Sequence, residues 1–170
     1  MVSRLNPIRI RISFPGKTYR LGDTANVRVH ITTLDTDVMV REARIGIECR
    51  VRYTEMRSGF SRRDALDYGR SGVALGRPLH TIVTPVKVEL SDIHDGPSFL
   101  TNRQLQARRT NSSNVRLQIP SELGRNAIYA QDIARTVFSW KVVVTADVSL
   151  ARDVIESKPI DIALTRPEAD

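Results

Sequence analysis

The sequence predicts an all-β protein in which two antiparallel sheets pack face to face. Three observations lead to this prediction: apolar side chains recur at every second position in many segments, turn-forming residues separate these segments, and no comparable helical periodicity exists. Alternation with a period of two places successive side chains on opposite faces of a strand. Sheets with one apolar and one polar face bury the apolar one, which is the architecture of a β-sandwich.

The alternation indicates strands at residues 8–14, 25–31, 43–53, 82–90, 115–119, 138–150 and 159–164. The first strand has Ile8, Ile10, Ile12 and Phe14 on its inward face. The inward face of the longest runs from Ala43 through Cys49 to Tyr53, and that of strand 138–150 runs from Phe138 to Leu150. We therefore expect one immunoglobulin-like sandwich domain over residues 1–170, with its core between about residues 8 and 164.

Two segments break this rhythm and predict long loops, 55–77 and 91–113. The first is rich in Gly, Ser and Arg, and the second is polar and contains Gly96-Pro97. Loops of this length are uncommon in compact domains, and alternation around Val73 and Leu75 leaves a further strand open for the first segment. One or two helical turns are expected within residues 121–135, with Ser121 as the capping residue.

Composition excludes several classes of protein. The chain has 170 residues, a net charge of +7 and a pI near 10.2. A single cysteine cannot form an intramolecular disulfide, the N-terminus lacks the apolar run of a signal peptide, and no segment approaches the roughly 20 apolar residues that span a bilayer. We expect a cytoplasmic protein.

The triplet Gly16-Lys17-Thr18 resembles the end of a phosphate-binding loop, but the rest of that motif is absent. The motif requires a glycine five positions before Gly16, where this chain has Arg11, and a helix after the triplet, where the sequence indicates a strand. Pro15-Gly16 is instead a turn between strands. No nucleotide is expected.

No residue pattern indicates catalysis, a metal site or a cofactor. Cys49 lies on an inward face, where burial makes a thiol inert. The histidines His30, His80 and His94 have no metal-binding spacing. Asp92, His94 and Asp95 form a small polar cluster, for which we expect a solvated loop and no cation. The sequence therefore predicts a protein that is not an enzyme.

Arginine dominates the charge and supplies the candidate binding residues. The outward arginines of three successive strands are Arg9, Arg11, Arg28, Arg44, Arg50 and Arg52, which form a cationic face if their strands share a sheet. Solvated side chains whose stems cover apolar neighbours are the alternative. In the predicted loops, the candidate partner-binding residues are Arg57, Arg62, Arg63, Arg103, Arg108 and Arg109, because guanidinium groups bind carboxylates and phosphates.

Several segments resemble the arrestin-like family. ISFPGKTYRLGDTANVRVHI resembles its opening strand, turn and second strand. VREARIGIECRVRYTE is similar to its long third stretch, VRLQIPSEL to an apolar strand that ends in proline, and FSWKVVVTADVSLARDVIESKPIDI to its closing pair. The resemblance covers residues 8–164 except the two loop segments. The family includes single-domain members among sporulation-control proteins. It implies a β-sandwich that acts as an adaptor or scaffold, and no functional residue carries over.

Together these observations predict a non-catalytic interaction module that binds an acidic partner protein, through an exposed sheet edge or through arginine-rich loops. The alternative is a basic surface that binds polyanions, either anionic lipid or nucleic acid. Nucleic acid is disfavoured because most aromatic residues lie on inward faces, where bases cannot stack on them. Self-association is left open by the sequence.

Overall fold

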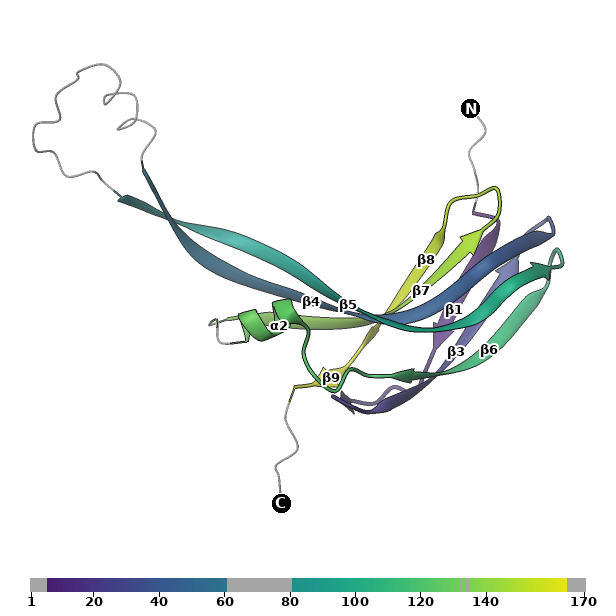
Figure 1. Cartoon of the computed structure of the whole chain (residues 1–170), viewed down its shortest axis with the longest axis horizontal. Helices are drawn as coiled ribbons and strands as arrows, with labels where there is room; N and C mark the ends of the chain where they lie inside the picture. The colour runs from purple at the N-terminus through teal and green to yellow at the C-terminus, as the bar shows by residue number, and fades with distance from the viewer. Residues whose placement is uncertain (1–5, 61–80, 132, 134, 165–170) are drawn as a thin grey trace, which may run out of the picture.

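The computed structural model describes residues 6–60, 81–131, 133 and 135–164. Two antiparallel sheets form a sandwich, from which a long two-stranded ribbon extends to one side (Figure 1). In chain order the elements are β1 (Ile8–Ser13), β2 (Tyr19–Arg20), β3 (Thr24–Thr33), β4 (Val38–Phe60), β5 (Thr81–Leu105), β6 (Thr110–Gln118), α2 (Arg125–Ala130), β7 (Val137–Val148), β8 (Val154–Ile160) and β9 (Ile162–Ala163). The predicted fold class is confirmed.

The two layers have different sizes. One is a three-stranded sheet in the order β1-β3-β6, and the other is a four-stranded sheet in the order β5-β4-β7-β8. Ile10 lies opposite Ile31 in the first, and Ile47 lies opposite Val142 in the second. Since directly opposed residues project from the same face, these registers bring the apolar side chains of neighbouring strands to one side.

Most of the predicted inward faces form the core, but none of the side chains described within residues 83–90 is fully buried. The β3 residues Ala25 to Ile31 and the β4 residues Ala43 to Tyr53 alternate between buried and solvent-facing positions. One end of the strand predicted at 138–150 differs, because β7 ends at Val148. The chain turns there, Leu150 has a φ of 64°, and its side chain is fully exposed. The expected inward position of Leu150 is therefore wrong.

The predicted loop over residues 91–113 is also wrong. β5 continues to Leu105, β6 begins at Thr110, and only residues 106–109 connect them. The reason is that β5 is an edge strand, where polar residues and proline are tolerated because one side of the backbone has no neighbouring strand. Of the other predicted loop, residues 55–60 belong to β4, and residues 61–77 lie outside the described part of the chain.

Gly96 allows a close approach between β5 and β4. Between Ala43 and Gly46 the register shifts, because β5 advances from Leu100 to Asp95 over the same distance. Such extra residues form β-bulges, which bend a strand locally. A β-carbon on Gly96 would overlap the carbonyl oxygen of Ile45. The Gly-Pro dipeptide is therefore part of the bulge and does not form a loop.

The short helix α2 is capped by a residue distant in sequence. Its N-cap residue is Gly124, which supplies no side chain, so the expected cap Ser121 is wrong. The backbone N–H groups of Asn126 and Ala127 donate instead to the carboxylate of Asp92 on β5, at 3.2 and 2.9 Å. Asp92 thus fixes the helix against the root of the ribbon.

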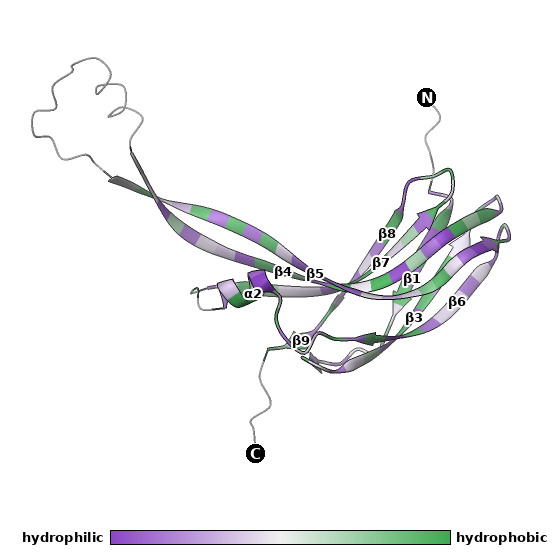
Figure 2. Cartoon of the chain, viewed as in Figure 1, coloured by the Kyte–Doolittle hydropathy of each residue, from purple (hydrophilic) through white to green (hydrophobic). Residues whose placement is uncertain are grey.

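The ribbon is formed by the distal parts of β4 and β5. β7 begins at Val137, opposite Arg52, so β4 beyond Arg52 pairs only with β5 within the described residues. Green apolar positions continue along the ribbon in Figure 2, and the side chains of Met56 and Val83 are 63% and 53% exposed. Two-stranded ribbons in water are marginally stable, which makes this segment the part of the fold with the least support.

Replacing Gly96 with alanine is expected to reduce the free energy of unfolding by about 1–3 kcal/mol, because the new methyl group must displace the backbone of Ile45. Gly16→Ala is the matched control, since no atom lies within 4 Å of a β-carbon at that position. Urea denaturation followed by circular dichroism measures both. Equal effects of the two substitutions would contradict the bulge geometry.

Candidate binding surface

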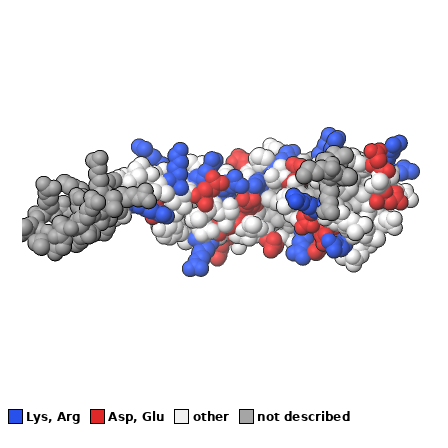
Figure 3. Space-filling model, turned by 90° about the horizontal axis from the view of Figure 1, so that it is seen from above, with Lys and Arg blue, Asp and Glu red and all other residues white. Residues whose placement is uncertain are grey.

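The two sheets separate the outward arginines into two groups. Arg9, Arg11 and Arg28 lie on the three-stranded sheet, whereas Arg44, Arg50 and Arg52 lie on the four-stranded one. The condition for a single cationic face, that these strands share one sheet, is therefore not met. In the view of Figure 3, basic and acidic side chains lie interspersed along the body, so the placement of the acids decides which face carries unbalanced charge.

The outer face of the three-stranded sheet has no acidic residue, because β1, β3 and β6 contain no Asp or Glu. We call this surface the arginine face. Its outward residues are Arg9, Arg11, Ser13, Thr24, Asn26, Arg28, His30, Thr32, Thr110, Ser112, Asn114, Arg116 and Gln118. All four arginines are exposed, and no ion pair joins any of them to a carboxylate in the described residues.

Cross-strand hydrogen bonds hold the polar residues of the arginine face in fixed rows. Arg28 Nε donates to Asn114 Oδ1 at 3.0 Å, and His30 Nδ1 lies 2.7 Å from Ser112 Oγ. A shallow hollow crosses one end of this face, lined among others by Asn26, Arg28 and Arg116. Side chains fixed in this way lose less conformational freedom when a partner binds.

The four arginines follow a diagonal across the sheet. Successive rows, read from the strand registers, contain Arg9, then Arg11, then Arg28 opposite Ser13, then Arg116 opposite Asn26. Each row thus carries one guanidinium group, and the group moves from β1 to β3 to β6. With strands about 4.8 Å apart and alternate residues about 6.8 Å apart, neighbouring arginines are separated by roughly 7–8 Å at their backbones.

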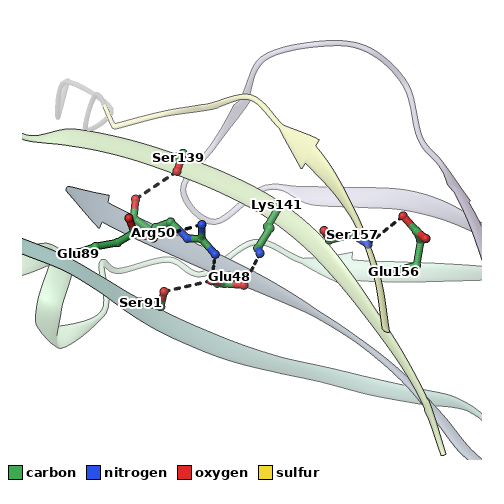
Figure 4. Close-up of polar contacts among 8 residues, drawn as sticks. All are labelled: Glu48, Arg50, Glu89, Ser91, Ser139, Lys141, Glu156 and Ser157. Atoms are coloured by element: carbon green, nitrogen blue, oxygen red, sulfur yellow. Dashed lines mark hydrogen bonds and ion pairs between the residues drawn. The ribbon is translucent and has the colours of Figure 1, made fainter. Parts of the chain in front are cut away.

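On the four-stranded sheet the basic residues are paired with acids. Glu48 is the centre of one cluster: Lys141 Nζ lies 2.9 Å from Glu48 Oε2, and Arg50 Nη2 lies 3.4 Å from Glu48 Oε1 (Figure 4). Arg44 pairs with Glu42 at 2.8 Å, and Arg41 pairs with Asp147 at 2.6 Å. This sheet therefore carries little unbalanced positive charge.

The predicted loop arginines do not form one site. Arg57 lies on the ribbon and pairs with Glu55 at 3.2 Å, and Arg108 lies in the β5–β6 turn and pairs with Asp35 at 3.1 Å. Arg103 lies opposite Val40 near the far end of the same hairpin, which places it roughly 55 Å along the strands from Arg57. Arg109 is exposed in the β5–β6 turn. Arg62 and Arg63 are outside the described residues.

Two other candidate residues, Cys49 and His94, pack against the core and do not line a site. Cys49 is fully buried, and burial raises the pKa of its thiol to about 12, with Asp92 and Glu48 adding to the effect. His94 is on β5, where its ring stacks on Trp140 with centroids 6.5 Å apart, so the expected solvated loop there is wrong. His80 is outside the described residues. Among those described, no three His, Cys, Asp or Glu side chains form a group suited to a metal ion.

Arg116 completes the arginine face, although sequence reasoning did not group it with Arg9, Arg11 and Arg28. The signal that places it outward is the alternation of Val115, Leu117 and Ile119. That alternation could not show that β6 pairs with β3, because strand pairing depends on contacts between distant segments.

No helix in the described part of the chain is long and apolar enough to cross a membrane.

No protein-family model and no curated protein matches the sequence. Among solved structures, the chain is similar to Spo0M, a sporulation control protein from Bacillus subtilis, with a TM-score of 0.53 and 10% identity. The match covers 95% of this chain and 51% of Spo0M, so the chain spans about half the length of that protein. At this identity the likeness shows the fold alone, a β-sandwich of arrestin-like type.

Glu48→Gln is expected to lower the free energy of unfolding at pH 7 by roughly 1–2 kcal/mol, because Lys141 and Arg50 lose their shared carboxylate. Burial acts to raise the pKa of Glu48, but bonds from Lys141 and Ser91 and the charge of Arg50 outweigh it and lower this pKa. Because the pKa of Glu48 is lower in the folded than in the unfolded chain, ionised Glu48 stabilises the fold at pH values above its unfolded pKa of about 4.3. This stabilisation is lost as the pH falls through the folded pKa.

The stability difference between the wild type and Glu48→Gln should therefore shrink as the pH is lowered from 6 to about 3. Urea denaturation at each pH measures it. A difference that stays constant over this range would mean that the Glu48 charge does not stabilise the four-stranded sheet.

Proposed function

We propose that the protein is a non-catalytic interaction module of arrestin-like type that binds an acidic partner protein through the arginine face. The observation that carries this proposal is the diagonal of Arg9, Arg11, Arg28 and Arg116 on a sheet without acidic residues. On the opposite sheet the basic groups are largely neutralised by Glu42, Glu48, Glu89 and Asp147. The arginine face is thus a described sheet surface on which several arginines without carboxylate partners lie together.

The spacing of the arginines matches an extended acidic segment. Carboxylates at alternate positions of an extended chain lie about 6.8 Å apart, close to the roughly 7–8 Å between neighbouring arginines on the diagonal. A guanidinium group binds a carboxylate through two parallel hydrogen bonds. Asn26, Asn114 and Gln118 add neutral amide groups along the same path, whose directional hydrogen bonds supplement the charge of the arginines.

The residue types on the arginine face favour protein over the polyanion alternatives. None of β1, β3 and β6 contains Phe, Tyr or Trp, and the rings at this face are those of His30 and of Phe14 at one end of the hollow, so it offers few platforms on which a nucleic-acid base can stack. Its outward positions are all polar, whereas proteins that bind the membrane interface also insert apolar side chains. Whether anionic lipid or nucleic acid binds this face instead is tested by the experiment below.

A variant with Arg9, Arg11, Arg28 and Arg116 all replaced by glutamate is expected to bind an acidic peptide at least about tenfold more weakly than the wild type, because each reversal converts attraction into repulsion. The probe is a fluorescent peptide of alternating Glu and Thr. Fluorescence polarisation at about 50 and 200 mM NaCl measures binding, which weakens with salt for exposed charges.

The matched control reverses Arg52, Arg103, Arg125 and Arg152, all of which are exposed and away from the arginine face, so both variants have the same net charge. Equal loss in the two variants would mean that net charge alone determines binding. Vesicles containing phosphatidylserine and single-stranded DNA are titrated in parallel. If either binds the wild type more tightly than the peptide does, and only the arginine-face variant loses that binding, the polyanion alternative replaces the acidic protein partner.

A further inference from the structure

The ribbon has two strand edges that lack a neighbouring strand in the described residues: the outer edge of β5, and the edge of β4 past the end of β7. The edge of β5 carries Pro85, which has no backbone N–H to donate to a partner strand, so we consider the edge of β4. β7 ends its pairing with β4 at Arg52, opposite Val137. The carbonyl group of Arg50 faces β7, where it accepts a hydrogen bond from Ser139 Oγ at 3.4 Å (Figure 4). Because backbone direction alternates along a strand, the N–H and C=O groups of Thr54, Met56 and Ser58 point to the same side, past the end of β7. An open edge of this kind accepts another strand.

The sequence along this edge is complementary to itself. In an antiparallel pairing centred on Met56, Glu55 lies opposite Arg57 of a second copy, Thr54 lies opposite Ser58, and Met56 lies opposite itself. We propose that the open edge of β4 pairs in this register with the same edge of a second copy. The two ribbons then form one four-stranded sheet in the order β5-β4-β4-β5, related by a two-fold axis.

Charge on one face of the ribbon supports this register. Glu55 and Arg57 lie on the same face and already pair at 3.2 Å within one chain. In the dimer, each carboxylate also gains the guanidinium group of the other copy directly across the strands. Opposite charges in directly opposed positions stabilise strand pairing, and like charges there destabilise it.

Apolar burial on the other face supports the same register. Met56 is 63% exposed and lies opposite Pro85 of β5 in its own chain. Pairing about Met56 creates the row Pro85, Met56, Met56, Pro85 across the four strands, which covers the methionine side chains with apolar neighbours. The ribbon also ceases to be two-stranded, and sheets of three or more strands are more stable in water.

The body of the protein limits the pairing to this segment. Counting outward from Met56, Tyr53 lies opposite Gly59, and the next pair joins Arg52 to Phe60. Val137 already occupies the side of Arg52 that this pair requires. The register therefore fills the open part of the edge and stops where β7 begins.

The test is sedimentation equilibrium of the wild type and of two single variants, Glu55→Arg and Arg57→Glu. The wild type is expected to dimerise. Each variant is expected to self-associate at least about tenfold more weakly, because the first places two guanidinium groups, and the second two carboxylates, directly opposite each other across the dimer. A mixture of the two variants should recover dimers, because in the mixed dimer both opposed pairs carry opposite charges. Loss of the pair within each chain cannot produce this recovery.

The matched controls are Glu42→Arg and Arg44→Glu, which break an equivalent pair on β4 where β5 and β7 flank the strand. These controls should dimerise as the wild type does, and circular dichroism verifies that every variant is folded. A monomeric wild type, variants that remain dimeric, or a mixture that stays monomeric would each overturn the proposal. Met56→Lys provides a second route, since it places like charges opposite each other on the axis.

Discussion

Burial of the inward side chains between two sheets is the constraint on which the rest of this structure depends. Because alternate residues of a strand point in opposite directions, fixing Ile10, Val29 or Ile47 in the core also fixes their neighbours on an outer face. The charge of each outer face then follows from which strands share a sheet. Arg28 on β3 has Asn114 beside it, whereas Arg50 on β4 has Glu48 and Glu89. Similar sequence patterns thus produce one cationic face and one balanced face.

Local physical rules made much of the fold predictable from sequence. Period-two alternation placed Cys49 and the residues around it in the core, and a proline-glycine pair marked the turn after β1. These features depend only on residues close together in the chain. The helix α2 was also expected, although its cap was not, because Asp92 reaches it from a strand more than thirty residues earlier.

Sequence reasoning failed where distant contacts determine the structure. Residues 91–105 are polar and include Gly96-Pro97, yet they form an edge strand, since β4 supplies a neighbour on one side only. Strand order was equally inaccessible, so Arg116 was not recognised as part of the arginine face. Arg57 and Arg103 were grouped because both lay in predicted loops, whereas the hairpin places them near opposite ends.

The structure separates two surfaces with different physical character. The arginine face covers the outer side of three strands that the core supports, and cross-strand hydrogen bonds hold several of its polar side chains in rows. The ribbon is narrow and has little support, and its open edge offers backbone groups together with Glu55, Met56 and Arg57. A module that pairs through the ribbon holds its two arginine faces at a distance from each other, and each face remains free to bind a partner.

If the acidic partner binds the arginine face and no other surface, the backbone amides of that face alone should respond to an acidic peptide. The most direct measurement is a titration of ¹⁵N-labelled protein with the alternating Glu-Thr peptide, followed by backbone amide chemical shifts. The perturbed amides are expected on β1, β3 and β6, with the largest changes along the line from Arg9 to Arg116. Perturbations concentrated on the four-stranded sheet, or spread evenly over every exposed arginine, would contradict it.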